Sequence, residues 1–173
     1  MDLDNLKFPI GKFHYSGAST REERSTWTAD IAALPDQLEE VLASFSPEEI
    51  ETPYRPEGWC AREVVHHLAD SHMNAVVRLK LALTEENPIV KPYAEARWAL
   101  LSDTQELPLD ASLSMLKGMH LKWAHLLNSL SPADWSRTYY HPEQKKEVSL
   151  DELVALYAWH GKHHLAHIKL VKG

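Results

Sequence analysis

The sequence predicts an all-α protein, a four-helix bundle with a long crossover segment and a small β-hairpin before the last helix. Two observations carry this prediction: four long stretches that suit helices, and proline-containing breaks between them. A third is a set of four Ser/Thr-x-x-acidic capping signatures, which begin at Thr20, Ser46, Ser131 and Ser149. At 173 residues the chain fits one domain with one core, so 1–173 is expected to be a single domain.

The first two long helices are delimited by caps and prolines. A capping box precedes a helix over 21–44, although Pro35 should kink or split it because proline lacks a backbone N–H. The segment 52–58 contains two prolines and a glycine and cannot be helix interior. A second helix over 60–84 follows and stops before Pro88.

The second half of the chain adds the crossover, the hairpin and two further helices. Residues 85–109 are long enough for a crossover or a lid, with a short helix around 93–100. A third long helix is expected over 110–130. A small hairpin is expected over 137–148, and the last long helix over 150–171. The signatures at Ser46 and Ser131 each begin only a turn or two.

Composition excludes several classes of protein. The net charge is −7, the pI is about 5.9, and no basic stripe is present, so a nucleic-acid partner is not expected. No apolar run approaches the roughly 20 residues that span a bilayer, and the N-terminus lacks the features of a signal peptide. The single cysteine, Cys60, excludes an intrachain disulfide framework. A cytoplasmic protein without membrane contact is therefore expected.

Histidine is the unusual residue of this sequence. Seven of the 11 histidines fall in the windows 66–72 and 160–167, and histidine is the commonest metal ligand. At about 100° per residue, His160 and His164 lie in the middle of the apolar stripe of the last helix. That stripe comprises Leu153, Leu156, Tyr157, Ile168 and Val171. His163 and His167 share the i,i+4 spacing but point more to one side.

Two imidazoles four residues apart on one helix face can reach the same ion, as in helical zinc sites. Facing and spacing together favour His160 and His164 as ligands. A pH-sensitive or merely polar helix is the alternative, because a lone core histidine usually just donates to a backbone carbonyl. Four histidines within eight residues are harder to explain in that way.

The second helix offers further candidates. His72 falls within its apolar stripe and His67 at the border, so periodicity does not choose between them as a ligand. Asp70 follows His67 by three residues and is the candidate catalytic base or orienting residue, with a surface ion pair as the alternative. A helix N-terminus favours the thiolate of Cys60, but a buried structural or capping role is the favoured interpretation.

Two segments carry a resemblance to a known family. Gly58-Trp59-Cys60-Ala61-Arg62-Glu63-Val64-Val65-His66-His67-Leu68-Ala69-Asp70 and the stretch from Tyr157 to Ile168 resemble the DinB-like superfamily, and within it the YfiT group. The resemblance runs nearly end to end. It implies a four-helix bundle that is usually a homodimer. It also implies one divalent transition metal per chain, zinc or nickel, held by His67, His160 and His164, which selects His67 over His72. Cys60 departs from the threonine or serine expected at that position.

The resemblance implies a metal-dependent hydrolase acting on a small molecule. A related branch implies the alternative of a thiol S-transferase that uses bacillithiol or a similar low-molecular-weight thiol in detoxification. Three neutral imidazoles leave a metal position open, where the ion activates either a water or a thiol. A non-enzymatic metal-binding bundle and a metal-free histidine pH switch are the remaining alternatives.

Overall fold

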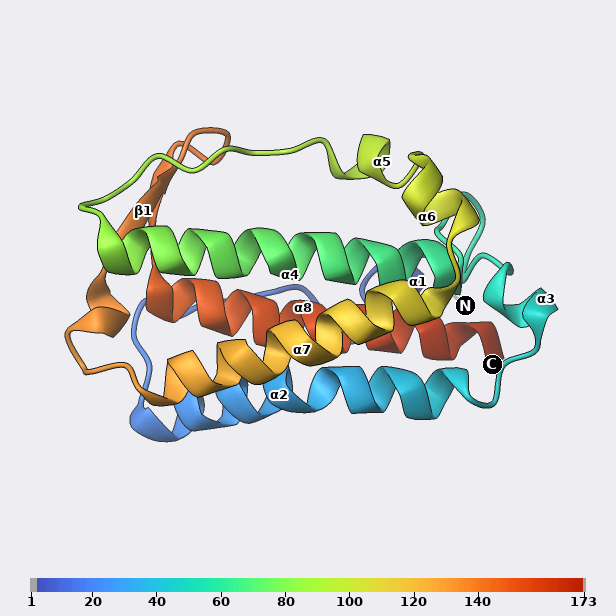
Figure 1. The fold of residues 1–173 in the computed structure, drawn as a ribbon, viewed down its shortest axis with the longest axis horizontal. Helices are drawn as coiled ribbons and strands as arrows, with labels where there is room; N and C mark the ends of the chain where they lie inside the picture. The colour runs from blue at the N-terminus through green and yellow to red at the C-terminus, as the bar shows by residue number, and fades with distance from the viewer. Residues whose placement is uncertain (1–2, 173) are drawn as a thin grey trace.

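Four long helices form the frame of the molecule, and they confirm the predicted four-helix bundle (Figure 1). They are α2 (Arg21–Leu42), α4 (Ala61–Thr84), α7 (Leu109–Asn128) and α8 (Leu150–Lys169). The computed structural model describes residues 3–172, so residues 1, 2 and 173 of the expected domain lie outside the described part. In that part, no helix is both long enough and apolar enough to cross a bilayer.

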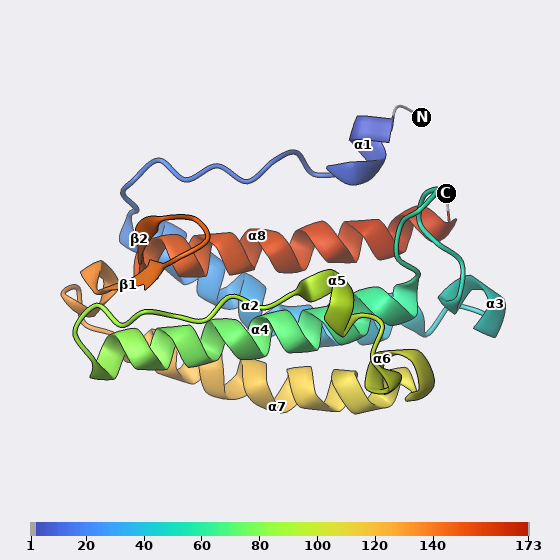
Figure 2. The same ribbon diagram turned by 90° about the horizontal axis from the view of Figure 1, so that it is seen from above.

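The crossover gives the bundle its topology. After α4 the chain turns back and runs beside that helix to its starting end, so that α7 runs parallel to α4 while α8 runs parallel to α2 (Figures 1 and 2). The expected short helix over 93–100 is present as α5 (Glu95–Trp98). A second short helix that the sequence did not indicate, α6 (Ser102–Glu106), follows after Leu101, whose backbone is extended.

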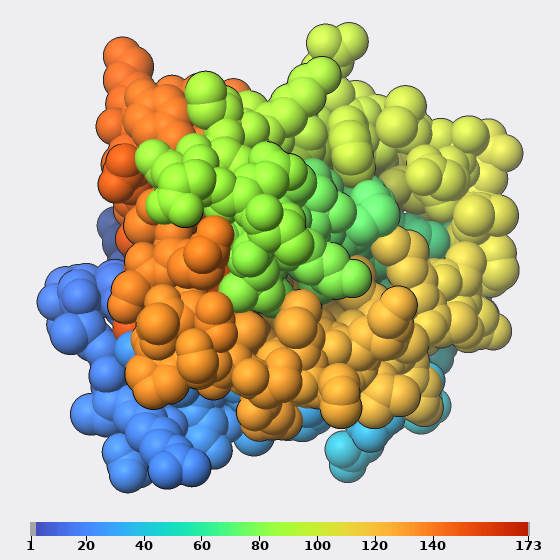
Figure 3. Space-filling view, turned by 60° about the vertical axis from the view of Figure 1, so that its left-hand side comes forward, coloured from blue at the N-terminus to red at the C-terminus, as the bar shows by residue number. Residues whose placement is uncertain are grey.

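The remaining elements close the two ends of the bundle. The predicted hairpin is present, with Thr138 paired to Ser149 and His141 to Lys146. The first part of the crossover is hydrogen-bonded to this hairpin, since the Val90 N–H donates to the Tyr140 carbonyl. Both parts pack together at one end of the molecule (Figure 3). The smaller elements are α1 (Leu3–Lys7), which the sequence did not indicate, α3 (Pro47–Ile50), η1 (Asp134–Ser136), β1 (Thr138–His141), β2 (Lys146–Ser149) and η2 (Leu170–Lys172).

Helix α2 passes through Pro35 without a break, so the expected split does not occur. Proline cannot donate to the carbonyl four residues earlier, which is that of Ile31. The Nδ1 of His120, on α7, lies 2.6 Å from this carbonyl oxygen and takes the place of the missing donor. A side chain of a neighbouring helix therefore satisfies the backbone group that Pro35 leaves free.

The apolar core is divided by a belt of histidines. One cluster packs residues such as Leu79, Trp123 and Leu153, and a second packs residues such as Leu68 and Leu165. On each of α4, α7 and α8 the two clusters are separated along the helix by histidines, which are His72, His120, His160 and His164. The polar belt places the candidate site at mid-height of the bundle.

Candidate metal centre

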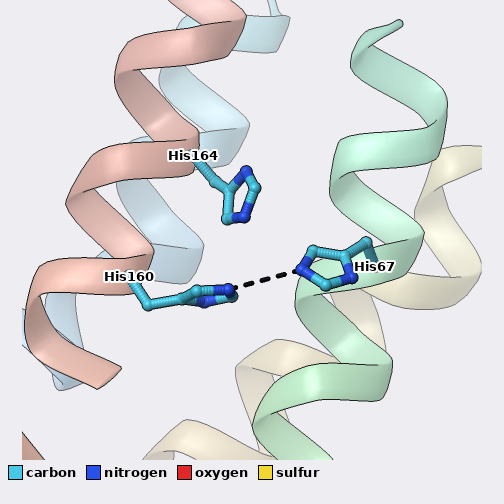
Figure 4. Close-up of side chains that lie close together, drawn as sticks. All are labelled: His67, His160 and His164. Atoms are coloured by element: carbon cyan, nitrogen blue, oxygen red, sulfur yellow. Dashed lines mark hydrogen bonds between the residues drawn. The ribbon is translucent and has the colours of Figure 1, made fainter. Parts of the chain in front are cut away.

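Three histidines from two helices converge at this belt. His67 comes from α4, and His160 and His164 come from successive turns of α8 (Figure 4). One ring nitrogen of each lies within 4.8 Å of the others. The Nε2 atoms of His67 and His160 are 3.3 Å apart. Two nitrogens bound at about 2.0–2.1 Å to one tetrahedral ion are about 3.3 Å apart, so this spacing suits a shared metal.

The protein environment keeps these rings neutral. Burial lowers the pKa of His67 to about 4. Burial first, and neighbouring histidines second, hold the pKa values of His160 and His164 well below the ordinary value. A neutral imidazole offers a lone pair to a metal, whereas a protonated one cannot ligate. The donor set is therefore ready to bind at neutral pH, and three imidazoles suit zinc, nickel, copper or iron.

Comparison with known proteins identifies the family. The sequence model of the DinB superfamily matches residues 25–168. This chain belongs to the DinB superfamily. A protein of Oceanobacillus iheyensis named "Putative metal-dependent hydrolase" is 49% identical over 164 residues, which are 95% of this chain and 94% of that protein. A protein of Bacillus mycoides with the same descriptive name is 48% identical over 96% of this chain and 95% of its own length.

A solved structure extends the comparison to the fold. YfiT from Bacillus subtilis superposes with a TM-score of 0.94 and 38% sequence identity, over 97% of this chain and 96% of that one. It is described as a probable metal-dependent hydrolase with an unusual four-helix bundle topology. The resemblance inferred from the two histidine segments is confirmed.

The other histidine considered on α4 has a different place in this DinB-superfamily protein. Within residues 3–172, the converging group of candidate ligands consists of His67, His160 and His164, and His72 is not part of it. It is fully buried, and its Nε2 lies 3.2 Å from the Nδ1 of His160. The structure therefore places His72 behind a candidate ligand.

Asp70 and Cys60 are not among the converging residues, and neither lines the cavity that all three histidines border. Burial and the nearby Asp103 raise the pKa of Asp70 to about 6, which places this carboxyl toward α6. Its catalytic role stays a prediction. Cys60 precedes α4 as its N-cap residue, and its backbone N–H donates to Glu63. Burial raises the pKa of the Cys60 thiol, so desolvation outweighs the helix N-terminus.

Two cavities adjoin the triad. One of about 400 Å³ is lined by all three histidines together with aromatic side chains such as Tyr54 and Trp59. A second cavity of about 190 Å³ is lined by His160 and by the buried Arg78. His160 and Glu95 border both cavities.

The carboxylate of Glu95 is the feature that sequence reasoning missed. It lies at the start of α5, within the crossover that the sequence identified as a possible lid. Partial burial raises the pKa of Glu95, and the positive charge of Arg78 opposes this shift. No motif marks Glu95, because its position depends on how the crossover packs against α4 and α8.

Proposed function

We propose that this protein is a metal-dependent hydrolase that acts on a small molecule with one divalent transition metal, zinc or nickel, bound by His67, His160 and His164. The observation that carries the proposal is the convergence of three neutral imidazoles beside a cavity that a carboxylate also borders. The names of the relatives support the same class of reaction.

The cavity and its lining agree with a hydrolytic site. A metal in such a site supplies Lewis-acid activation of water and of the bond to be cleaved. Three ligands from the protein leave part of the coordination sphere to the cavity. Its volume of about 400 Å³ suits a small molecule. The aromatic rings of Tyr54 and Trp59 offer apolar contacts to such a substrate.

In this proposal Glu95 is the general base. Its raised pKa brings the carboxylate closer to neutral pH, which favours taking a proton from water and passing it to the leaving group. Glu95 also borders both of the cavities that His160 lines.

The first test is metal content by mass spectrometry, on protein purified without a nickel column. Wild type is expected to carry about one equivalent of a transition metal per chain, because three neutral donors converge on one point. His160→Ala should lose it. The control is His125→Ala, since His125 is exposed on α7. Absence of metal in wild type after incubation with zinc or nickel would refute the proposal.

Activity then separates the alternatives. Hydrolysis of ester and amide panels that disappears on chelation supports the hydrolase. Turnover only when a low-molecular-weight thiol and an electrophile are both supplied supports the S-transferase. Metal binding without turnover on either panel supports a non-enzymatic metal-binding bundle.

The homodimer is a proposal that rests on the family resemblance. Light scattering of the purified chain should give twice the chain mass of 19.7 kDa. A mass of one chain at micromolar concentration would contradict it.

A further inference from the structure

Behind His160, a chain of side chains leads away from the candidate metal. The Nδ1 of His160 lies 3.2 Å from the Nε2 of His72. The Nδ1 of His72 lies 3.0 Å from the Nε2 of His120. The Nδ1 of His120 lies 2.6 Å from the carbonyl oxygen of Ile31. His72 and His120 are both fully buried, so water does not complete their hydrogen bonds.

The Ile31 carbonyl at the end of this series of hydrogen bonds determines which ring nitrogen of each histidine carries the hydrogen. A carbonyl oxygen only accepts, so the Nδ1 of His120 carries the hydrogen, and a neutral imidazole has only one N–H. The Nε2 of His120 therefore accepts from the Nδ1 of His72. By the same step the Nε2 of His72 accepts from the Nδ1 of His160. The Nε2 of His160 is left bare, and this is the atom that faces His67.

A second and shorter chain lies behind His164. The Nδ1 of His164 lies 3.3 Å from the Nδ1 of His167. The Nε2 of His167 lies 3.2 Å from the carbonyl oxygen of Lys7. This carbonyl also only accepts, so His167 carries its hydrogen on Nε2 and accepts on Nδ1. His164 must then donate from Nδ1, which leaves its Nε2 bare.

Both anchors are carbonyls that lack a helical donor. The Ile31 carbonyl has none because residue 35 is proline. Lys7 is the last residue of α1, and the last carbonyls of a helix have no partner within it. Each is thus free to accept from an imidazole. The two anchors come from α2 and from the N-terminal segment, neither of which contributes to the triad.

We propose that His72 with His120, and His167 separately, are positioning residues that hold His160 and His164 in the Nδ1–H tautomer and aim their Nε2 lone pairs at one metal ion. The inference rests on the proposed metal site. It assigns a task to histidines that do not themselves ligate. Hydrogen bonds to the second nitrogen of a ligand imidazole fix its orientation and raise its basicity, which strengthens metal binding.

The first arm of the test needs no metal. Long-range ¹H–¹⁵N NMR of the histidine rings in zinc-free wild-type protein reports which nitrogen carries each hydrogen. His160 and His164 are expected as Nδ1–H and His167 as Nε2–H. An Nε2–H tautomer at His160 and His164 would overturn the inference.

The second arm measures zinc affinity by competition with a chromophoric chelator. His72→Leu and His167→Leu are each expected to weaken zinc binding by about 10–100-fold, as typical for loss of such partners. His72→Gln and His167→Asn each put an amide oxygen at about the position of the ring nitrogen that accepts the hydrogen bond in wild type. We therefore expect both variants to bind zinc within a few-fold of wild type. His125→Leu, on the exposed face of α7, is the matched control and should not change affinity.

The outcomes separate this inference from the metal site itself. Leucine variants that bind zinc as tightly as wild type would overturn the positioning role while the site stands. Wild type with the expected tautomers but no zinc binding would refute the proposed function, while the two series of hydrogen bonds behind His160 and His164 would still hold. If His72→Leu does not fold, the His167 variants and the wild-type tautomers decide the question.

Discussion

Glu95 is the residue whose substitution tests the proposed chemistry most directly. Glu95→Gln keeps the size of the side chain but removes the base, so kcat at pH 7 should fall by about 10²–10⁴-fold. The metal content should not change, because Glu95 is not among the converging ligands. The measurement is kcat on the best substrate of the ester and amide panels. The matched control is Glu57→Gln, which alters another carboxylate at the same cavity.

The pH profile adds a second readout for Glu95. A base must be deprotonated, so activity should fall as the pH drops through its pKa, which burial raises above the ordinary glutamate value. This acid limb should change in Glu95→Gln. An unchanged kcat and acid limb in that variant would exclude Glu95 as the base.

At the same scale, the candidate ligands were only partly predictable from the sequence. The helical wheel selected His160 and His164, because both had to face the core from one helix. It did not choose between His67 and His72, since His72 falls within the apolar stripe of α4 and His67 lies at its border, and the family resemblance made that choice. The structure shows the reason for the ambiguity: both residues contact His160, one on each side of its ring.

At the scale of helices, Pro35 and His120 should be energetically coupled. His120→Leu leaves the buried Ile31 carbonyl without a donor, which costs about 1–3 kcal/mol. In a Pro35→Ala background residue 35 supplies the missing N–H, so the same substitution should cost less. The loss of the bond to His72 occurs in both backgrounds and cancels. Urea unfolding of the four metal-free proteins should therefore give a coupling of about 1 kcal/mol or more.

The control for this cycle is His125→Leu, which should be additive with Pro35→Ala. Additivity of His120→Leu with Pro35→Ala, within about 0.5 kcal/mol, would show that the imidazole does not replace the missing backbone donor.

Element positions were predictable where local chemistry sets them. The capping hydroxyls of Thr20 and Ser149 mark the starts of α2 and α8, and each accepts from the backbone N–H three residues later. The effect of Pro35 was not predictable, because the side chain that satisfies the Ile31 carbonyl comes from α7, far along the sequence. Helix α6 was likewise not expected, because it lies in the crossover and packs against α4, which is distant from it in the sequence.

At the scale of the whole molecule, the histidine belt makes stability depend on pH. The pKa values of His72 and His120 are lowered from 6.5, mainly by burial. In the unfolded chain these rings take up protons as the pH falls below 6.5, while the folded protein resists protonation. Their contribution to stability is therefore complete above pH 6.5 and is lost as the pH falls toward their folded pKa values.

The magnitude follows from the same linkage. One pH unit below 6.5, a histidine ring that stays neutral in the folded state lowers the unfolding free energy by about 1.4 kcal/mol. Asp70 acts in the opposite direction, because its pKa is raised from 3.8 to about 6. By the same linkage, protonation of Asp70 adds less than about 1 kcal/mol to the unfolding free energy at pH 5.5. The destabilising effect of the histidines is therefore the larger of the two.

We predict that the metal-free protein is less stable at pH 5.5 than at pH 7.5 by about 2 kcal/mol or more, as measured by urea unfolding with a chelator present. The remaining buried histidines act in the same direction. His72→Gln removes one titrating ring and should flatten the pH dependence by about 1 kcal/mol. Equal stability at the two pH values would contradict this prediction. It would mean that the histidines of the belt take up protons as readily in the folded protein as in the unfolded chain, so that the core does not keep these imidazoles neutral.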